Sequence, residues 1–323
     1  MVAAMVCIGG LTRLTQSGLS MVTWDPVTGV IPPLSREDWE AAFAAYQQYP
    51  EYQKVNAHFT LADFQSIYWF EYLHRLLGRL TGLVYGLPLL WFLARRAIPR
   101  AMVPQLVGLL ALGGLQGFVG WWMVASGLKD RPDVAQERLA THLGLAFLLF
   151  AALTWQARTL LVPADPTPPP ARLRRVVTGL AVAVYLTALT GALVAGTDAG
   201  YSYNTFPWMN GAWVPQGYAA MSPLWRNWLD NPAAIQFNHR WIAITLVSAI
   251  LATWAWSRRL DLGPDARRAM NTLAGAAVLQ VSLGVATLLS VVWLPLASGH
   301  QLGALLLLAM ATRATHALWR PGG

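Results

Sequence analysis

The residues best able to do chemistry in this chain are a carboxylate and an imidazole three positions apart, Glu71 and His74. On a helix this spacing places both side chains on one face. They stand at the mouth of a long apolar run, where ionisable groups are costly to bury and therefore indicate a function. The same pattern recurs with an amide in place of the acid, as Gln236 and His239. This predicts two related halves, of which only the first keeps the carboxylate for chemistry.

Four of the six histidines occupy equivalent places in this repeat, each at one end of an apolar run: His74, His142, His239 and His300. The two histidines of each half are too far apart in sequence to form a local chelate, but facing helices could hold a planar metal group from both sides. This favours a haem with two axial histidines. Copper is the alternative metal that imidazole binds readily, with Met209 and Met221 as a weak supporting case.

Other ionisable residues are assigned smaller roles. Arg75 and Arg240 each follow a predicted ligand histidine, and a guanidinium can form paired hydrogen bonds with a haem propionate. Snorkelling of these arginines towards the membrane surface is the alternative interpretation. His58 and His316 have no counterpart in the other half. His58 is predicted to be structural or solvated, and His316 to be a C-terminal helix residue of no special role.

The elements that must position these residues are membrane helices. The chain has 323 residues, of which 55% are hydrophobic and 12% charged, and several apolar runs exceed the roughly 20 residues that cross a bilayer as a helix. Spans are predicted at residues 72–94, 102–125, 139–162, 176–195, 237–257, 271–293 and 300–319. A shorter run at residues 1–11 is interpreted as part of a truncated first helix. The prediction is an all-α polytopic membrane protein with eight transmembrane helices.

Repeated motifs divide these helices into two groups of four. Ser17-Gly18-Leu19-Ser20 corresponds to Ala199-Gly200-Tyr201-Ser202, and Gln116 corresponds to Gln280. Two four-helix bundles in parallel orientation imply a pseudo-two-fold axis along the membrane normal. The predicted parts are residues 1–162, which contain His74 and His142, a Pro/Arg-rich cytoplasmic linker at 163–175, and residues 176–323, which contain His239 and His300.

The net charge of +8 indicates membrane topology and not nucleic-acid binding. Arginines gather in alternate short loops, which the positive-inside rule assigns to the cytoplasm. Both termini are then cytoplasmic, and the four histidines lie towards the outer side.

Local signals predict how two segments pack. Ser35 and Asp38 have the spacing of a capping box, and they precede an aromatic stripe at Trp39, Phe43 and Tyr46 that is expected to pack as one helix face. Glycines in the span at residues 102–125 are predicted to allow close helix contact; they are Gly113, Gly114, Gly117 and Gly120.

These motifs together resemble the heme A synthase family. The resemblance covers essentially the whole chain and is carried by Gly9 to Ser20, Glu71-Tyr72-Leu73-His74-Arg75, His142, Ala199 to Pro207, Asn238-His239-Arg240 and Gly299-His300-Gln301. It implies oxidation of a methyl group of haem O to the formyl group of haem A, for terminal oxidases. Water is the hypothesised oxygen source. The resemblance also implies a haem b held by His239 and His300, and a substrate haem between His74 and His142.

Glu71 is the predicted catalytic residue, because only the first half has a carboxylate beside its haem site. It would stabilise positive charge on the methyl carbon or take a proton as water attacks. The main alternative is a di-haem b quinol or electron-transfer membrane cytochrome, in which both halves hold permanent haems. A haem transporter is a further alternative. The difference between Glu71 and Gln236 favours the synthase.

The resemblance also implies a setting for the protein. The expected partners are haem O, haem O synthase, oxidase assembly factors and the lipid bilayer, with a possible homo-oligomer and no nucleic acid. The expected location is a bacterial inner membrane, with the haem sites towards the periplasm. Some branches of the family carry a cysteine pair in the first outer loop, whereas the single cysteine here is Cys7. The chain therefore resembles the proteobacterial and mitochondrial type.

Overall fold

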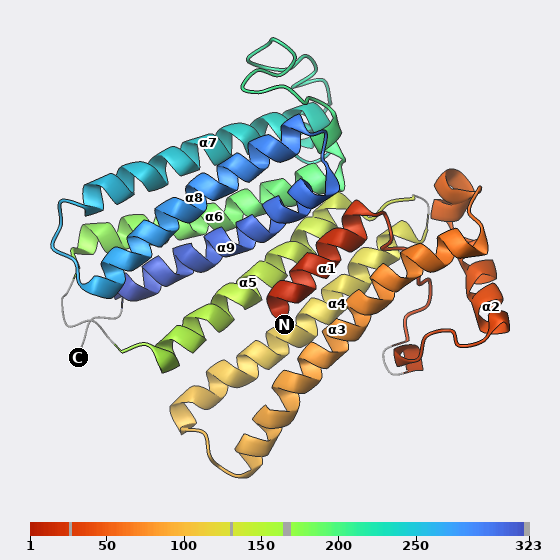
Figure 1. The fold of residues 1–323 in the computed structure, drawn as a ribbon, viewed down its shortest axis with the longest axis horizontal. Coiled ribbons are helices and arrows are strands. Elements are labelled where there is room, and N and C mark those ends of the chain that lie inside the picture. Colours follow the sequence, from red (N-terminus) through yellow and green to blue (C-terminus); the bar gives the residue numbers. More distant parts are fainter. Residues whose placement is uncertain (26–27, 130–131, 164–168, 320–323) are drawn as a thin grey trace. The chain divides into compact units, whose positions relative to one another are not determined.

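The regular elements of the chain are helices throughout the part that the computed structural model describes, which is residues 1–25, 28–129, 132–163 and 169–319. Seven helices in this part are long and apolar enough to cross a membrane. The α-helices are α1 (Val2–Leu14), α2 (Arg36–Tyr46), α3 (Leu61–Ala94), α4 (Val103–Gly127), α5 (Gln136–Leu161), α6 (Ala171–Gly196), α7 (Pro232–Ser257), α8 (Pro264–Leu289) and α9 (Leu294–Trp319) (Figure 1). Short helical turns lie at Thr28–Val30, Tyr52–Asn56, Arg100–Met102, Ala199–Tyr201 and Leu224–Trp228. The chain is an all-α polytopic membrane protein, as predicted.

Helix α3 begins well before its predicted start. Thr60 and Asp63 form a capping box at its N-terminus, and the roughly three added turns carry polar residues that the hydropathy pattern did not assign to a span. Glu71 and His74 consequently lie inside a helix and not at its mouth. Helix α8 ends earlier than predicted, because Val291 and Val292 adopt positive φ angles of 54° and 59° that break the helix.

The helices form two compact units, residues 1–146 and 147–323, with the division inside α5. The sequence instead predicts a division at the linker of residues 163–175, of which residues 164–168 lie outside the described part. That assignment of parts stays a prediction.

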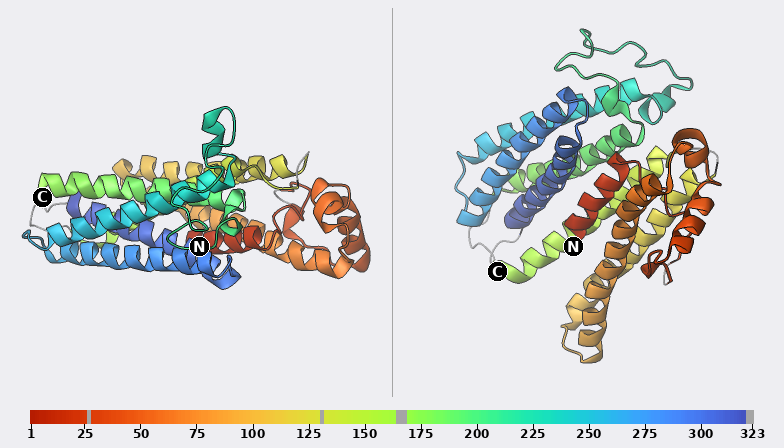
Figure 2. Two further views of the ribbon diagram at one scale, coloured as in Figure 1. Left: turned by 90° about the horizontal axis from the view of Figure 1, so that it is seen from above. Right: turned by 45° about the vertical axis from the view of Figure 1, so that its right-hand side comes forward.

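In the second unit, α6 packs against α7 and α9, and α8 packs against the same two helices. The four therefore lie side by side around a common core (Figures 1 and 2). At one end of this unit, Asp265 forms ion pairs with Arg158 at 2.6 Å and Arg313 at 3.4 Å. His316 is buried there, with Nε2 3.1 Å from Thr159 Oγ1 and its ring against Trp155. These contacts make His316 a packing residue of this end of the unit.

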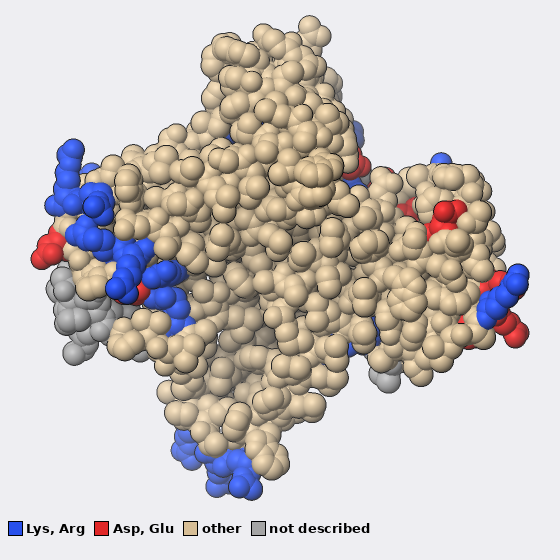
Figure 3. Space-filling view, viewed as in Figure 1, with Lys and Arg blue, Asp and Glu red and all other residues tan. Residues whose placement is uncertain are grey.

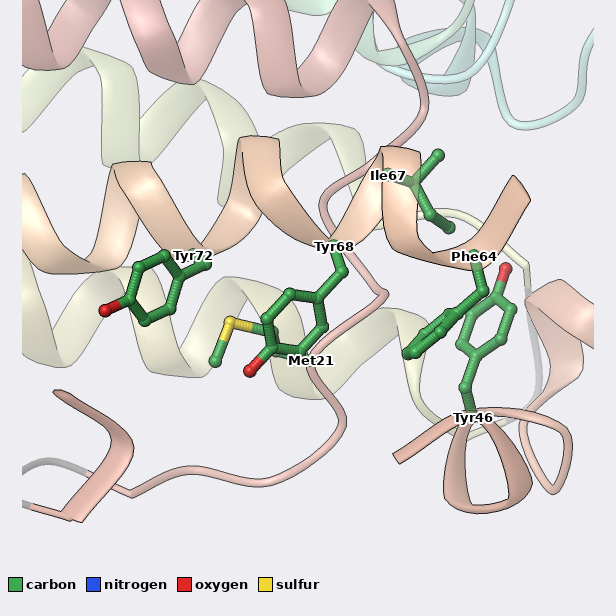
Figure 4. Packing of buried hydrophobic residues seen from close by; sticks show 6 residues of the cluster. All are labelled: Met21, Tyr46, Phe64, Ile67, Tyr68 and Tyr72. Carbon is green, nitrogen blue, oxygen red and sulfur yellow. The ribbon is translucent and has the colours of Figure 1, made fainter. Parts of the chain in front are cut away.

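In the first unit, α1, α2 and α4 each contact α3. The predicted capping box is present, since Ser35 Oγ accepts from Asp38 N and Asp38 accepts from Ser35 N. The aromatic stripe of α2 packs as predicted against α3, where Tyr46 stacks on Phe64 at 5.2 Å between ring centroids. Figure 4 shows the cluster, which comprises Met21, Tyr46, Phe64, Ile67, Tyr68 and Tyr72. It ties the segments between α1 and α3 to the end of α3 that carries Glu71.

The predicted helix-contact role of the α4 glycines is wrong for three of them. A Cβ built at Gly113, Gly114 or Gly117 would have no atom within 4 Å. Only the fourth member of the series, Gly120, meets a neighbour, and that neighbour is the His142 ring. Spacing alone does not distinguish a glycine on an open face from one that a side chain approaches.

The long helices present apolar faces to their surroundings. In α3, the exposed residues include Leu83, Leu87, Leu90 and Trp91, as expected of a helix that faces lipid. Lysines and arginines gather at helix ends on the face shown in Figure 3, including the end of the α3–α4 hairpin. His58 is exposed and contacts Phe59, which agrees with the solvated role predicted for it.

Candidate functional site

Each unit brings two of the predicted histidines close enough to interact electrostatically. His74 of α3 pairs with His142 of α5 in the first unit, and His239 of α7 pairs with His300 of α9 in the second. All four residues remain partly accessible. In each unit the two histidines of a predicted pair are electrostatic neighbours, and they come from helices that do not follow one another along the chain.

Each histidine ring lies against a glycine of a neighbouring helix: His74 against Gly9, His142 against Gly120, His239 against Gly191, and His300 against Gly284. A Cβ added at these glycines would lie only 2.8 to 3.2 Å from Cε1 of the ring. These glycines also occupy equivalent positions in the repeat, since Gly9 and Gly191 are separated in sequence by the same number of residues as Ser17 and Ala199. A side chain at any of these places would push the ring out of position.

These surroundings fit a haem. The Nδ1 atoms of His74 and His300 are buried and have no hydrogen-bond partner of good geometry in the described residues. Leaving a buried polar atom unpaired is costly, which indicates that these rings have a function. No group of three or more His, Cys, Asp or Glu side chains that could hold a metal ion occurs in the described residues. A histidine pair on facing helices suffices for a haem, because the porphyrin supplies the other iron ligands.

Replacing Gly284 with alanine is expected to lower haem occupancy of the second unit at least about tenfold, because the new Cβ would displace the His300 ring. Gly275 is the matched control: it lies on the same helix, and a Cβ there would meet nothing within 4 Å. Alanine is also the better helix former at both positions. Haem content and absorption spectra of the purified variants measure the effect. Equal occupancy in the two variants would show that the close approach of Gly284 is unimportant.

The predicted catalytic carboxylate, Glu71, is buried and held from three sides. Ser20 Oγ and Met21 N both donate to its Oε2 at 2.8 Å, and Arg75 Nη2 donates to its Oε1 at 2.5 Å. Arg75 also donates to the carbonyl oxygens of Met21 and Thr23. The Glu71–Arg75 pair thus fastens the segment that follows α1 to the face of α3 that carries His74.

The second unit repeats this arrangement with an amide. Arg240 donates to the carbonyl oxygens of Tyr203 and Thr205 at 2.6 and 2.7 Å, and to Gln236 Oε1 at 3.3 Å. Tyr203 and Thr205 have the same repeat offset from Met21 and Thr23 as the glycines described above. Both arginines therefore bind loop carbonyls in the structure. Their predicted contact with haem propionates stays a proposal.

A second buried carboxylate, Glu51, lies between α2 and α3. Tyr46 Oη donates to Glu51 Oε2 at 2.9 Å, and Asn56 Nδ2 donates to Tyr46 Oη at 2.9 Å. Burial raises the pKa of the Glu51 carboxyl to about 8 against the opposing effect of the Tyr46 hydrogen bond, and the charge of Glu71 also raises it. Glu51 therefore holds a proton at neutral pH.

This pKa makes the stability of the fold pH-dependent. Between the ordinary carboxyl value and pH 8, the folded chain keeps a proton on Glu51 that the unfolded chain has lost, so the free energy of unfolding falls as pH rises. Glu51→Gln mimics the protonated acid. It is expected to match the unsubstituted chain near pH 4 and to exceed it at pH 7 by on the order of 3 kcal/mol.

Thermal unfolding of the detergent-solubilised protein across this pH range measures the difference. Glu40→Gln is the control, because Glu40 is exposed and forms an ion pair with Arg36 on its own helix. Parallel stability curves for Glu51→Gln and the unsubstituted chain would show that Glu51 is ionised in the fold.

Sequence reasoning missed the glycines, Glu51 and the polar neighbours of the histidines. The repeat could have identified the glycines, because Gly120 and Gly284 are separated in sequence by the same number of residues as Gln116 and Gln280. No comparable signal exists for Glu51, because the second unit has no counterpart of that loop.

Fold and site together define a polytopic helical membrane protein with one histidine pair in each of two units. A family profile described as cytochrome oxidase assembly protein, COX15-CtaA, matches residues 1–312. The chain belongs to this family.

Relatives that match nearly the whole chain are heme A synthases. That of Rhodospirillum centenum is 49% identical over 323 residues, covering 99% of this chain and 86% of the relative. That of Nitrosospira multiformis is 46% identical, covering 99% and 91%. Heme A synthase COX15 of Arabidopsis thaliana is 43% identical, covering 99% and 72%. The resemblance inferred from the motifs is therefore confirmed.

Proposed function

We propose that this chain is a heme A synthase, which oxidises a methyl group of haem O to the formyl group of haem A. The observation that carries the proposal is the asymmetry of two otherwise matching sites. Each has a histidine pair and an arginine that fastens a loop, but only the first has a carboxylate, Glu71, where the second has Gln236. Membership of a family whose relatives are heme A synthases supports the same conclusion.

The two units would then have different tasks. His239 and His300 would hold a resident haem b, which supplies one-electron redox chemistry when bound. His74 and His142 would hold the substrate haem O. Gly9 and Gly120 leave the space in which those two rings can approach a planar ligand.

Glu71 would act mainly as a fixed negative charge. Its two oxygens already accept hydrogen bonds from Ser20, Met21 and Arg75, which favours an electrostatic role over that of a proton acceptor. Electrons leave the methyl carbon to an electron acceptor, water supplies the oxygen atom, and the protons pass to solvent. A preorganised carboxylate in a buried site stabilises the positive charge that develops on that carbon.

The membrane setting follows from the charge pattern. The basic loops favour both termini in the cytoplasm, and the histidine pairs then lie towards the periplasmic side of a bacterial inner membrane. Haem O synthase and oxidase assembly factors would be functional partners, because they supply the substrate and use the product.

An electron-transfer cytochrome with two permanent haems is the second candidate. The repetition of the arginine contacts in both units favours it, since two equivalent haem sites need no difference in surroundings. Glu71 has no role in that account.

Expression in a host that makes haem O but lacks its own heme A synthase distinguishes the two candidates. A synthase restores haem A and the absorption of an aa3-type oxidase in membranes. A host that continues to accumulate haem O, although the protein is present in its membranes, would exclude the synthase.

A further inference from the structure

The His239 ring is held by the hydroxyl group of Thr190 on α6. Thr190 Oγ1 lies 2.7 Å from His239 Nδ1 and donates its own proton to the Thr187 carbonyl oxygen at 2.7 Å. A hydroxyl has one proton and two lone pairs, so Thr190 can only accept from the ring. Nδ1 of His239 therefore carries the proton, and Nε2 keeps a lone pair.

This is the tautomer that a ligand histidine needs. Histidines that bind metal usually donate their second ring N–H to a fixed acceptor, which sets the tautomer and the orientation of the ring. Gly191, the next residue of α6, lies against Cε1 of the same ring. Thr190 and Gly191 thus fix two neighbouring atoms of the His239 imidazole from one helix.

The first unit lacks this hydroxyl. Ile8 precedes Gly9 in α1 as Thr190 precedes Gly191 in α6, and the two pairs are related by the repeat offset. His74 has no hydroxyl beside its Nδ1 atom; the polar neighbour of its ring is the Met5 backbone, which is within hydrogen-bonding reach. Among the described residues, no side-chain hydroxyl fixes the tautomer of His74 as Thr190 fixes that of His239.

His142, the second histidine of the first unit, has a hydrogen-bond donor as its neighbour, whereas His239 has an acceptor. The Gln116 amide nitrogen lies 3.2 and 3.3 Å from the two ring nitrogens of His142. It also donates to the His142 carbonyl oxygen at 3.0 Å, which determines which end of the amide faces the ring. A donor in this place competes for the lone pair that a metal requires.

We propose that Thr190 is a positioning residue that fixes His239 for ligation of the resident haem, and that Ile8 in the equivalent place leaves the haem of the first unit free to exchange. The inference rests on the proposed function, in which the first unit takes up substrate and releases product. The second unit keeps its haem throughout. The residue beside the ligand histidine, Thr190 or Ile8, would then determine whether a unit keeps its haem or exchanges it.

Release of haem b tests the role of Thr190. Protein purified from cells without haem O is mixed with excess haem-free myoglobin, and transfer of haem is followed by absorbance. Thr190→Val, which removes the hydroxyl, is expected to release haem b about 10- to 100-fold faster and to change the low-spin electron paramagnetic resonance signal. Thr190→Ser, which keeps the hydroxyl, is expected to restore slow release and the original signal.

Thr253→Val is the matched control, because within the part of the chain that the structure describes the Thr253 hydroxyl bonds only to the backbone carbonyl of Ala249 in its own helix. Equal release rates and spectra for Thr190→Val and the unsubstituted protein would overturn the proposal. Failure of Thr190→Ser to restore them would show that the shape of Thr190 matters and its hydroxyl does not, which also overturns it.

Ile8→Thr tests the second part without weakening the resident site. The Met5 carbonyl stands three positions before Ile8, as the Thr187 carbonyl does before Thr190, so the new hydroxyl has an acceptor for its proton. Protein from cells that make haem O should retain more haem O and haem A after washing than the unsubstituted chain. Unchanged retention would contradict this part. If the unsubstituted chain never contains haem O or haem A, the proposed function fails while the Thr190 result on haem b still stands.

Discussion

Glu71→Gln is expected to lower haem A formation at least about 100-fold, because the fixed negative charge is lost, while haem b content stays near that of the unsubstituted chain. The variant removes the negative charge and also replaces one acceptor oxygen with an NH2 group, so part of the set of donors from Ser20, Met21 and Arg75 loses its acceptor. The second unit shows that an amide is compatible with this environment, because Gln236 accepts from Arg240 and donates to the Tyr203 carbonyl oxygen. Haem extraction and chromatography from cells that supply haem O measure both quantities.

Two controls accompany this variant. Gln236→Glu introduces the acid into the second unit and is expected to give no additional product, because that unit holds the resident haem. Glu40→Gln removes an exposed carboxylate that pairs with Arg36 at 2.7 Å, and it should leave haem A formation unchanged. Full activity of Glu71→Gln would remove Glu71 from the mechanism.

Alanine substitutions of the ligand histidines are expected to have different effects in the two units. His300→Ala is expected to remove most haem b, because a haem held from both sides loses one of its axial ligands. His142→Ala is expected to retain haem b and to lose haem A formation, because the substrate site lies in the other unit. The haem content and haem A yield of each purified variant check the two expectations.

His58→Ala serves as the control, since His58 is exposed and contacts only the neighbouring Phe59 ring among the aromatic side chains of the described residues. Loss of haem b from His142→Ala to the same extent as from His300→Ala would indicate two permanent sites. The electron-transfer cytochrome would then be the better account.

The helices and the histidine pairing were predictable from sequence for a clear physical reason. Apolar runs long enough to cross a bilayer can only be helical there, and the repeat placed four histidines at equivalent positions. The early start of α3 was not predictable in this way, because the Thr60 capping box precedes polar residues that do not resemble a membrane span. A hydropathy pattern identifies the lipid-facing part of a helix but does not identify a polar extension of the same helix beyond the membrane.

The surroundings of the site were less predictable than its ligands. Arg75 and Arg240 could be recognised as neighbours of histidines, but their bonds to the carbonyls of Met21 and Tyr203 depend on how loops fold back. Thr190 is one of many threonines that could simply bond to their own helix. Its contact with His239 appears only once α6 and α7 are packed together.

The most direct test of the central claim is haem analysis of the protein purified from cells with and without co-expressed haem O synthase. The proposed function predicts a constant haem b content in both preparations, with haem O and haem A appearing only when haem O is supplied. Two haem b per chain in both preparations, without haem A, would contradict it and identify an electron-transfer cytochrome.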